Sequence, residues 1–206
     1  MSADREHWES AWSDRAPTEV GWYQAEAACS LELITELAPT MSTPIIDIGS
    51  GASVLVASLL DAGARDLTVI DISARALDHA RRRLGSKAAD VTWIEDDVLR
   101  HHFERRFGVW HDRAMFHFLR EPPDRARYTE SARSAVVDGG HLVIATFTPD
   151  APPTCSGLPV ERYDPDRLAE AFADAFEPVR FVTEEHRTPG GVDQQYVYGV
   201  FRRSSP

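Results

Sequence analysis

The chain has 206 residues, of which 33 are acidic and 22 are basic, and its formal net charge is -11. An acidic surplus repels the nucleic-acid backbone, so we predict no nucleic-acid partner. The two cysteines, Cys29 and Cys155, are far apart and form no CxxC motif, so we predict neither a disulfide framework nor a metal site. Since no apolar segment resembles a membrane span or a secretory signal, we expect a cytoplasmic protein with no membrane partner.

Apolar periodicity predicts helices that alternate with strands along most of the chain. Helices are expected over residues 23–37, 54–60, 74–84, 124–137 and 165–176. Strands are expected over residues 44–48, 67–71, 91–94, 107–110, 140–147, 179–184 and 194–201. The proline-rich residues 148–153 are expected to form a loop, and the last two strands flank the turn sequence Thr188-Pro189-Gly190-Gly191.

This alternation predicts an α/β fold with a Rossmann-like, doubly wound, mostly parallel sheet that ends in an antiparallel hairpin. No linker is long enough to separate two domains, so we expect a single domain over residues 1–206. Its parts are an N-terminal arm and helix (1–40), a core (41–147), and a final part with a loop, a helix and the terminal strands (148–206).

A glycine-rich turn follows the first predicted strand in the sequence Asp47-Ile48-Gly49-Ser50-Gly51. Glycines at this point let the backbone turn tightly and let a ligand approach without meeting a Cβ atom. Asp71 ends the next predicted strand, where a carboxylate can accept both hydroxyls of a ribose. The dinucleotide fingerprint requires a further glycine where Val54 stands, so the pattern favours a nucleoside without a pyrophosphate over a nicotinamide dinucleotide.

In the order and spacing of these motifs, residues 44–147 resemble the class I S-adenosylmethionine-dependent methyltransferases. The resemblance implies the class I methyltransferase fold, S-adenosyl-L-methionine as cofactor, a cofactor-binding core over residues 41–147 and an acceptor side over 148–206. It also implies that the glycine turn wraps the methionine part, although Ser53 stands where the family often has a third glycine. Asp71 would bind the ribose and Ile72 would lie against the adenine, whose amino group would donate to Asp97, with Asp96 as the alternative. The predicted cofactor-binding residues are Trp22, Asp47, Gly49, Gly51, Ser53, Asp71, Ile72, Asp97, Val98 and His111.

The N-terminal arm resembles the lid segment of a subgroup of small methyltransferases, through Trp8, Trp12 and the Trp22-Tyr23 pair. Aromatic faces over a sulfonium would attract its charge and exclude water. The alternative is that Trp8 and Trp12 are packing residues that hold the arm in place.

Residues 111–119 follow the fourth predicted strand, where the family places residues that line the methyl-acceptor pocket. A histidine titrates near neutral pH and suits the base that deprotonates an acceptor. The predicted catalytic residues are His111, His117 and Asp112, with Asp112 either orienting an imidazole or helping to bind the cofactor. The predicted substrate-binding residues are Tyr23, Arg113, His117 and Arg162. The competing interpretation of both histidines is structural, as hydrogen-bonded or packed groups.

The resemblance therefore implies an enzyme that transfers a methyl group from S-adenosylmethionine to a small-molecule nucleophile, with a thiol or another chalcogen as a candidate acceptor. One alternative is a protein-lysine methyltransferase. Another is a non-catalytic nucleoside-binding domain, because a fold by itself does not specify catalysis. The oligomeric state is left open.

Overall fold

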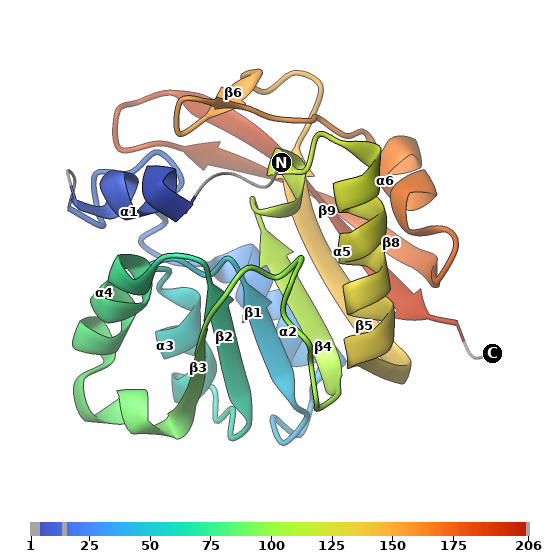
Figure 1. The fold of residues 1–206 in the computed structure, drawn as a ribbon, viewed down its shortest axis with the longest axis horizontal. Helices are drawn as coiled ribbons and strands as arrows, with labels where there is room; N and C mark the ends of the chain where they lie inside the picture. The colour runs from blue at the N-terminus through green and yellow to red at the C-terminus, as the bar shows by residue number, and fades with distance from the viewer. Residues whose placement is uncertain (1–4, 14–15, 205–206) are drawn as a thin grey trace.

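The computed structural model describes residues 5–13 and 16–204. A seven-stranded sheet runs through the centre of the molecule (Figure 1). Its strands are β1 Ile45–Ile48, β2 Leu67–Asp71, β3 Val91–Glu95, β4 Phe107–Arg113, β5 Val136–Phe147, β8 Phe176–Arg187 and β9 Asp193–Arg203. The strand order is β3-β2-β1-β4-β5-β9-β8, and the short strands β6 Thr154–Cys155 and β7 Leu158–Pro159 form a separate hairpin.

Six α-helices are seen among the described residues, together with two short 3-10 segments at 85–90 and 116–118. The helices are α1 Arg5–Ser13, α2 Ala28–Leu37, α3 Leu55–Asp61, α4 Ala74–Leu84, α5 Pro122–Ala135 and α6 Pro165–Phe172. Helix α4 begins where the Ser73 hydroxyl accepts a hydrogen bond from the Ala76 amide. Helix α6 begins with Asp164 as its cap and Pro165 at its first position, a combination that satisfies free amide groups at a helix start.

The first five strands of the sheet are parallel, and β9 runs antiparallel to both β5 and β8. Strand β1 pairs with β2 on one side and with β4 on the other, so the strand order reverses direction between β1 and β4. In open α/β sheets, ligands bind outside the carboxyl ends of the strands at such a switch point. The glycine turn at residues 49–51 lies at this position.

The core has two halves because the sheet is covered on both faces. In β1, Ile45 packs into the half under α2 and α3, and its neighbour Ile46 packs into the half under α5 and α6. Successive strand residues point to opposite faces, so this run must be apolar throughout.

The predicted fold class is confirmed, with a mostly parallel sheet and a terminal antiparallel hairpin. Several boundaries differ: the helix expected over 23–37 begins at Ala28, and the helix expected up to residue 176 ends at Phe172. The helix expected over 124–137 is α5, and its last two expected residues, Val136 and Val137, belong instead to β5. Both are β-branched and pack better on a pleated sheet than in a helix. Helix α1 and the β6–β7 hairpin were not predicted.

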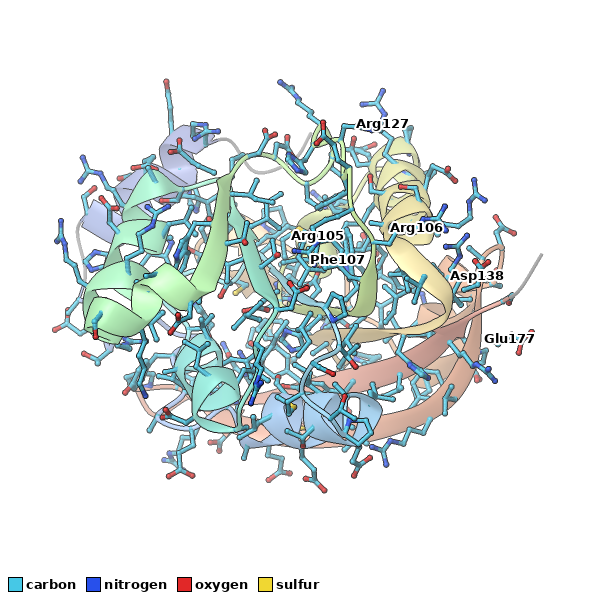
Figure 2. All side chains as sticks on the ribbon, turned by 90° about the horizontal axis from the view of Figure 1, so that it is seen from below. Arg105, Arg106, Phe107, Arg127, Asp138 and Glu177 are labelled. Carbon is cyan, nitrogen blue, oxygen red and sulfur yellow. The ribbon has the colours of Figure 1, made fainter. Side chains whose placement is uncertain are left out.

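The end of the sheet opposite the switch point carries exposed charged groups. Figure 2 shows Arg105 and Arg106 just before Phe107, the first residue of β4, with Arg127, Asp138 and Glu177 also at the surface. Arg105 is paired with Asp66 at 2.5 Å. The predicted site residues lie instead toward the other end, where Figure 1 shows α1 and the β6–β7 hairpin above the strands.

Candidate active site

The glycine turn after β1 requires residues without a side chain. Gly49 and Gly51 have φ angles of 59° and 57°, in the left-handed region that other residues rarely adopt. A Cβ atom on Gly49 would lie 2.8 Å from Cβ of Met115, and one on Gly51 would lie 2.8 Å from the indole of Trp12. Glycine is therefore required at both positions, where Met115 and Trp12 pack directly on the backbone, and both glycines also line a cavity.

Asp71 at the end of β2 is tied to this turn. Its carboxylate accepts from the Gly51 amide at 2.8 Å and from the Ser73 amide at 2.8 Å. Burial raises the pKa of Asp71 to about 6, against the lowering effect of these two hydrogen bonds. The carboxylate holds the glycine turn in place and faces the cavity beside it.

Two adjoining cavities, of ≈ 100 Å³ and ≈ 50 Å³, lie at the carboxyl ends of the strands and share walls at Ile48, Gly49 and Trp22. The first cavity is lined by these predicted cofactor-binding residues: Trp22, Gly49, Gly51, Asp71, Ile72, Asp97 and Val98. The second cavity is lined by Trp22, Asp47, Gly49, Ser53 and His111, together with Tyr23. The structure thus brings every predicted cofactor-binding residue to one continuous site. Asp96 also lines the first cavity, so both candidates for the adenine contact are present.

His111 belongs to a buried hydrogen-bond chain. Its Nδ1 lies 2.6 Å from Oδ1 of Asp47, its register partner on β1, and its Nε2 lies 2.9 Å from the hydroxyl of Ser30 on α2. Tyr198 continues the chain, at 3.3 Å from Ser30, and donates to Glu184 at 3.0 Å. Asp47 keeps a second oxygen, Oδ2, which is buried and has no hydrogen-bond partner among the described residues.

Asp112 does not contact His111, contrary to the expectation that it orients an imidazole. Because neighbouring residues of a strand point to opposite faces, its carboxylate lies on the other side of the sheet. There it accepts from the Tyr128 hydroxyl at 2.6 Å and from the amides of Met115 and Phe116. Burial raises the pKa of Asp112 to about 6. Asp112 therefore fixes the turn after β4. Asp47, and not Asp112, is the carboxylate that orients the His111 imidazole.

His117 is enclosed rather than exposed to a ligand. It is fully buried, its ring centroid lies 4.5 Å from that of Phe118 and 4.9 Å from that of Phe147, and it lines neither cavity. Burial, with a smaller effect of the nearby Arg113 cation, lowers the pKa of His117 to about 3. This environment disfavours a base or a substrate ligand at His117, because a proton placed there would be strongly disfavoured.

Arg113 lies at the end of β4 and lines both cavities. Its guanidinium stacks on the ring of Tyr196 with 4.2 Å to the centroid, donates to the Tyr198 hydroxyl at 3.1 Å, and lies 3.5 Å from Glu184. Arg162, the other predicted substrate ligand, instead donates to the carbonyl groups of Pro149 and Ala151. It therefore holds the loop that follows β5.

Three tryptophans from the N-terminal part cover the site. The rings of Trp8 and Trp12 both meet Trp22 edge to face, with centroids 5.9 Å and 5.6 Å apart, and Trp8 also packs on Phe118. Helix α1 is held on α4 by an ion pair of Glu9 with Arg75 at 3.1 Å. The arm therefore lies across the mouth of the site, and Trp12 directly contacts the glycine turn.

The family comparison agrees with this geometry. Residues 45–140 match the family model described as a methyltransferase domain, and this segment holds the glycine turn, Asp71 and Asp97. Within this segment the chain is similar to the class I S-adenosylmethionine-dependent methyltransferases. The matched domain is that of an enzyme. No curated protein matches the sequence.

Solved structures share the fold of this chain at low sequence identity. The N-methyltransferase NodS from Bradyrhizobium japonicum WM9, in complex with S-adenosyl-L-homocysteine, is 16% identical, with a TM-score of 0.75 over 98% of each chain. A second structure is 19% identical, with a TM-score of 0.73 over 98% of this chain and 90% of the other. It is named for the conversion of a disulfide bond into a thioacetal group during echinomycin biosynthesis. The Burkholderia thailandensis 1,6-didemethyltoxoflavin-N1-methyltransferase is also 19% identical, with a TM-score of 0.70 over 98% and 87%.

A third cavity, of ≈ 450 Å³, lies between α1 and the β6–β7 hairpin. It shares Trp22 and Cys155 with the first cavity. His7, Ser10 and Gln194 line it, and none of the three was predicted to be a site residue. In the sequence, only the three-residue spacing of His7 and Ser10 could have indicated this wall, because it places both residues on one face of a helix.

Within the described residues, no helix is long and apolar enough to cross a membrane. No group of three or more histidine, cysteine, aspartate or glutamate side chains in this same part of the chain is arranged to hold a metal ion.

Proposed function

We propose that the chain binds S-adenosylmethionine across the first and second cavities and transfers its methyl group to a small-molecule nucleophile. One observation carries the proposal: the buried Asp71 and the unpartnered Oδ2 of Asp47 lie at the two sides of one bare glycine turn. We place a ribose at Asp71 and the α-ammonium group of the same ligand at Asp47. The structure of NodS with S-adenosyl-L-homocysteine supports this cofactor.

The first cavity suits the adenosine part of the cofactor. Asp71 would accept from the ribose hydroxyls, Ile72 and Val98 would enclose the adenine ring, and Asp97 would accept from its amino group. A carboxylate that accepts from a hydroxyl forms a hydrogen bond about twice as strong as a neutral pair. The Gly51 amide already holds the Asp71 carboxylate, so it needs little rearrangement when it binds the ribose.

The second cavity suits the methionine part. Oδ2 of Asp47 is buried without a partner, and such a group is costly unless a ligand satisfies it. An ammonium group would supply both the charge and the hydrogen-bond donor. We place Arg113 beside the cofactor as well, since it lines the first two cavities and not the third.

The chemical contribution of the protein is mainly positioning. The sulfonium of the cofactor supplies an electrophilic methyl with a good leaving group. The chain's residues must therefore align the acceptor with that methyl and exclude water. Trp8, Trp12 and Trp22 close the site over the glycine turn and present aromatic faces near a cation.

A small acceptor fits the cover over the site better than a protein substrate does. Helix α1 lies across the mouth, whereas a protein-lysine methyltransferase needs an open groove for the partner chain. Two of the structural neighbours, named for didemethyltoxoflavin and for echinomycin biosynthesis, support small or natural-product acceptors. The second of them, named for a change at a disulfide, keeps a thiol among the candidates.

Calorimetric titration with S-adenosylhomocysteine tests the cofactor site. The wild-type chain should bind it, and Asp71→Ala should bind about ten times more weakly, because a charge-assisted hydrogen bond is lost. Asp61→Ala, on the surface at the end of α3, is the matched control and should bind as the wild type does. Equal affinity in all three proteins would remove Asp71 from the ribose site. Binding without turnover on any acceptor would favour the non-catalytic alternative.

A further inference from the structure

Two residues in the wall of the third cavity each carry a buried polar atom that lacks a partner. His7 on α1 and Gln194 on β9 line the cavity, and neither Nε2 of His7 nor Oε1 of Gln194 has a hydrogen-bond partner among the described residues. Buried polar groups are nearly always paired, so two orphans in one cavity indicate that a ligand satisfies them. Both can act as acceptors, which requires a ligand with N–H, O–H or S–H groups.

The described part of the wall of the third cavity favours an uncharged ligand. Of the described residues that form its wall, none is an aspartate, glutamate, lysine or arginine. A charged ligand would be desolvated there without a counter-charge, at a cost of several kcal/mol. The volume of ≈ 450 Å³ is within the range of small-molecule sites.

The third cavity is next to the site that we propose for the cofactor. Trp22 and the buried Cys155 belong to the walls of both the third and the first cavity. A ligand in the third cavity would therefore meet the cofactor at this shared wall. The two histidines that the sequence predicts as bases are unsuited: both nitrogens of His111 are engaged by Asp47 and Ser30, and His117 is enclosed by aromatic rings.

We propose that the third cavity binds an uncharged methyl acceptor and that His7 is the general base that removes its proton. This inference rests on the proposed function. In the transfer, the acceptor atom forms a bond to the methyl carbon, the carbon–sulfur bond of the sulfonium breaks, and its electron pair stays on sulfur. The acceptor's proton passes to Nε2 of His7, and Gln194 accepts a second hydrogen bond that orients the acceptor. Since His7 lies on α1, closing the arm over the site also delivers the base.

The charge of the acceptor is tested with methyl-labelled S-adenosylmethionine and a small-molecule extract of the source cells. Ion exchange separates the extract into neutral, cationic and anionic pools before the full-length protein is added. The label should enter the neutral pool. Label only in a charged pool overturns the proposal, as does the absence of label from all pools when S-adenosylhomocysteine binds. Failure to bind S-adenosylhomocysteine would instead contradict the proposed function itself.

The role of His7 is tested on the labelled neutral pool. His7→Ala and His7→Gln should each lower kcat at least a hundredfold, the usual contribution of a general base, and leave affinity for S-adenosylhomocysteine within twofold. Added imidazole should restore part of the activity of His7→Ala but not of His7→Gln, whose side chain fills the space. His102→Ala, at an exposed histidine, is the matched control. Wild-type kcat in either His7 variant, or no rescue by imidazole, overturns the assignment of the base.

Discussion

The imidazole of His111 and the carboxylate of Asp47 face each other on neighbouring strands, with 2.6 Å between Nδ1 and Oδ1. The carboxylate accepts, so Nδ1 donates to it, and Nε2 forms a hydrogen bond with the Ser30 hydroxyl. One oxygen of Asp47 is thereby fixed, and the other is buried without a partner among the described residues, in a side chain that lines the second cavity. His111 is thus a positioning residue for Asp47.

Replacing His111 should weaken both the fold and cofactor binding. His111→Ala leaves the Asp47 carboxylate buried without its partner, which should lower the free energy of unfolding by about 1–3 kcal/mol. Affinity for S-adenosylhomocysteine should fall as well, because Asp47 is no longer held in place. Chemical denaturation and calorimetry measure the two effects. Ser30→Ala is the control, since it removes the hydrogen bonds of Ser30 to His111 and Tyr198 but leaves the His111–Asp47 pair, and it should cost less in both. A folded His111→Ala variant with wild-type affinity for S-adenosylhomocysteine would contradict the role of His111 in positioning Asp47.

Cofactor affinity should depend on pH through Asp71. Burial raises the pKa of this carboxyl to about 6, and the ribose hydroxyls need its ionised form as acceptor. A ligand that binds the ionised form loses affinity as pH falls through that pKa, by about tenfold between pH 7.5 and pH 5. Titration with S-adenosylhomocysteine across this range measures the slope. Asp71→Asn should bind more weakly and show a flatter profile. An unchanged affinity at pH 5 in the wild type would contradict the ribose contact.

Gly51→Ala should be destabilising for two separable reasons. Alanine at φ 57° is strained, by about 1 kcal/mol or more, and its Cβ would lie 2.8 Å from the Trp12 indole. Trp12→Ala removes the second problem only, so the double variant should lose less stability than the sum of the two single variants. A double-mutant cycle from denaturation curves gives this coupling. Strict additivity would mean that Trp12 does not pack on the glycine turn in solution.

Tyr128→Phe should lower the free energy of unfolding and leave cofactor affinity unchanged. The Tyr128 hydroxyl donates to Asp112 at 2.6 Å and accepts from the Trp110 indole at 2.9 Å, all within the core half under α5 and α6. Its removal leaves both partners buried and less satisfied, at a cost of about 2–3 kcal/mol in unfolding free energy. Asp112 lines neither the first nor the second cavity, so affinity for S-adenosylhomocysteine should stay within twofold. A large loss of affinity with little loss of stability would mean that Asp112 contributes to cofactor binding.

The sequence predicts the fold and the cofactor half of the site because both depend on local patterns. Periodicity locates the buried strands, and a strand that ends in Asp47-Ile48-Gly49 places the turn at their carboxyl ends. The acceptor half depends on contacts between distant residues. The spacing of His111 and Asp112 cannot show that the sheet separates their side chains, and His117 is shielded by Phe147 from another strand. His7 and Gln194 line the same cavity only because the arm folds across the sheet.

The most direct test of the account is thermal unfolding of the full-length protein with S-adenosylmethionine, S-adenosylhomocysteine or NADH. A ligand at a hundredfold excess over its Kd should stabilise the fold by about 2.7 kcal/mol, which for a chain of this size raises Tm by about 5–10 °C. The account predicts this rise with the first two ligands and none with NADH. A rise with NADH alone, or with none of the three in a folded sample, would contradict an S-adenosylmethionine site at the glycine turn.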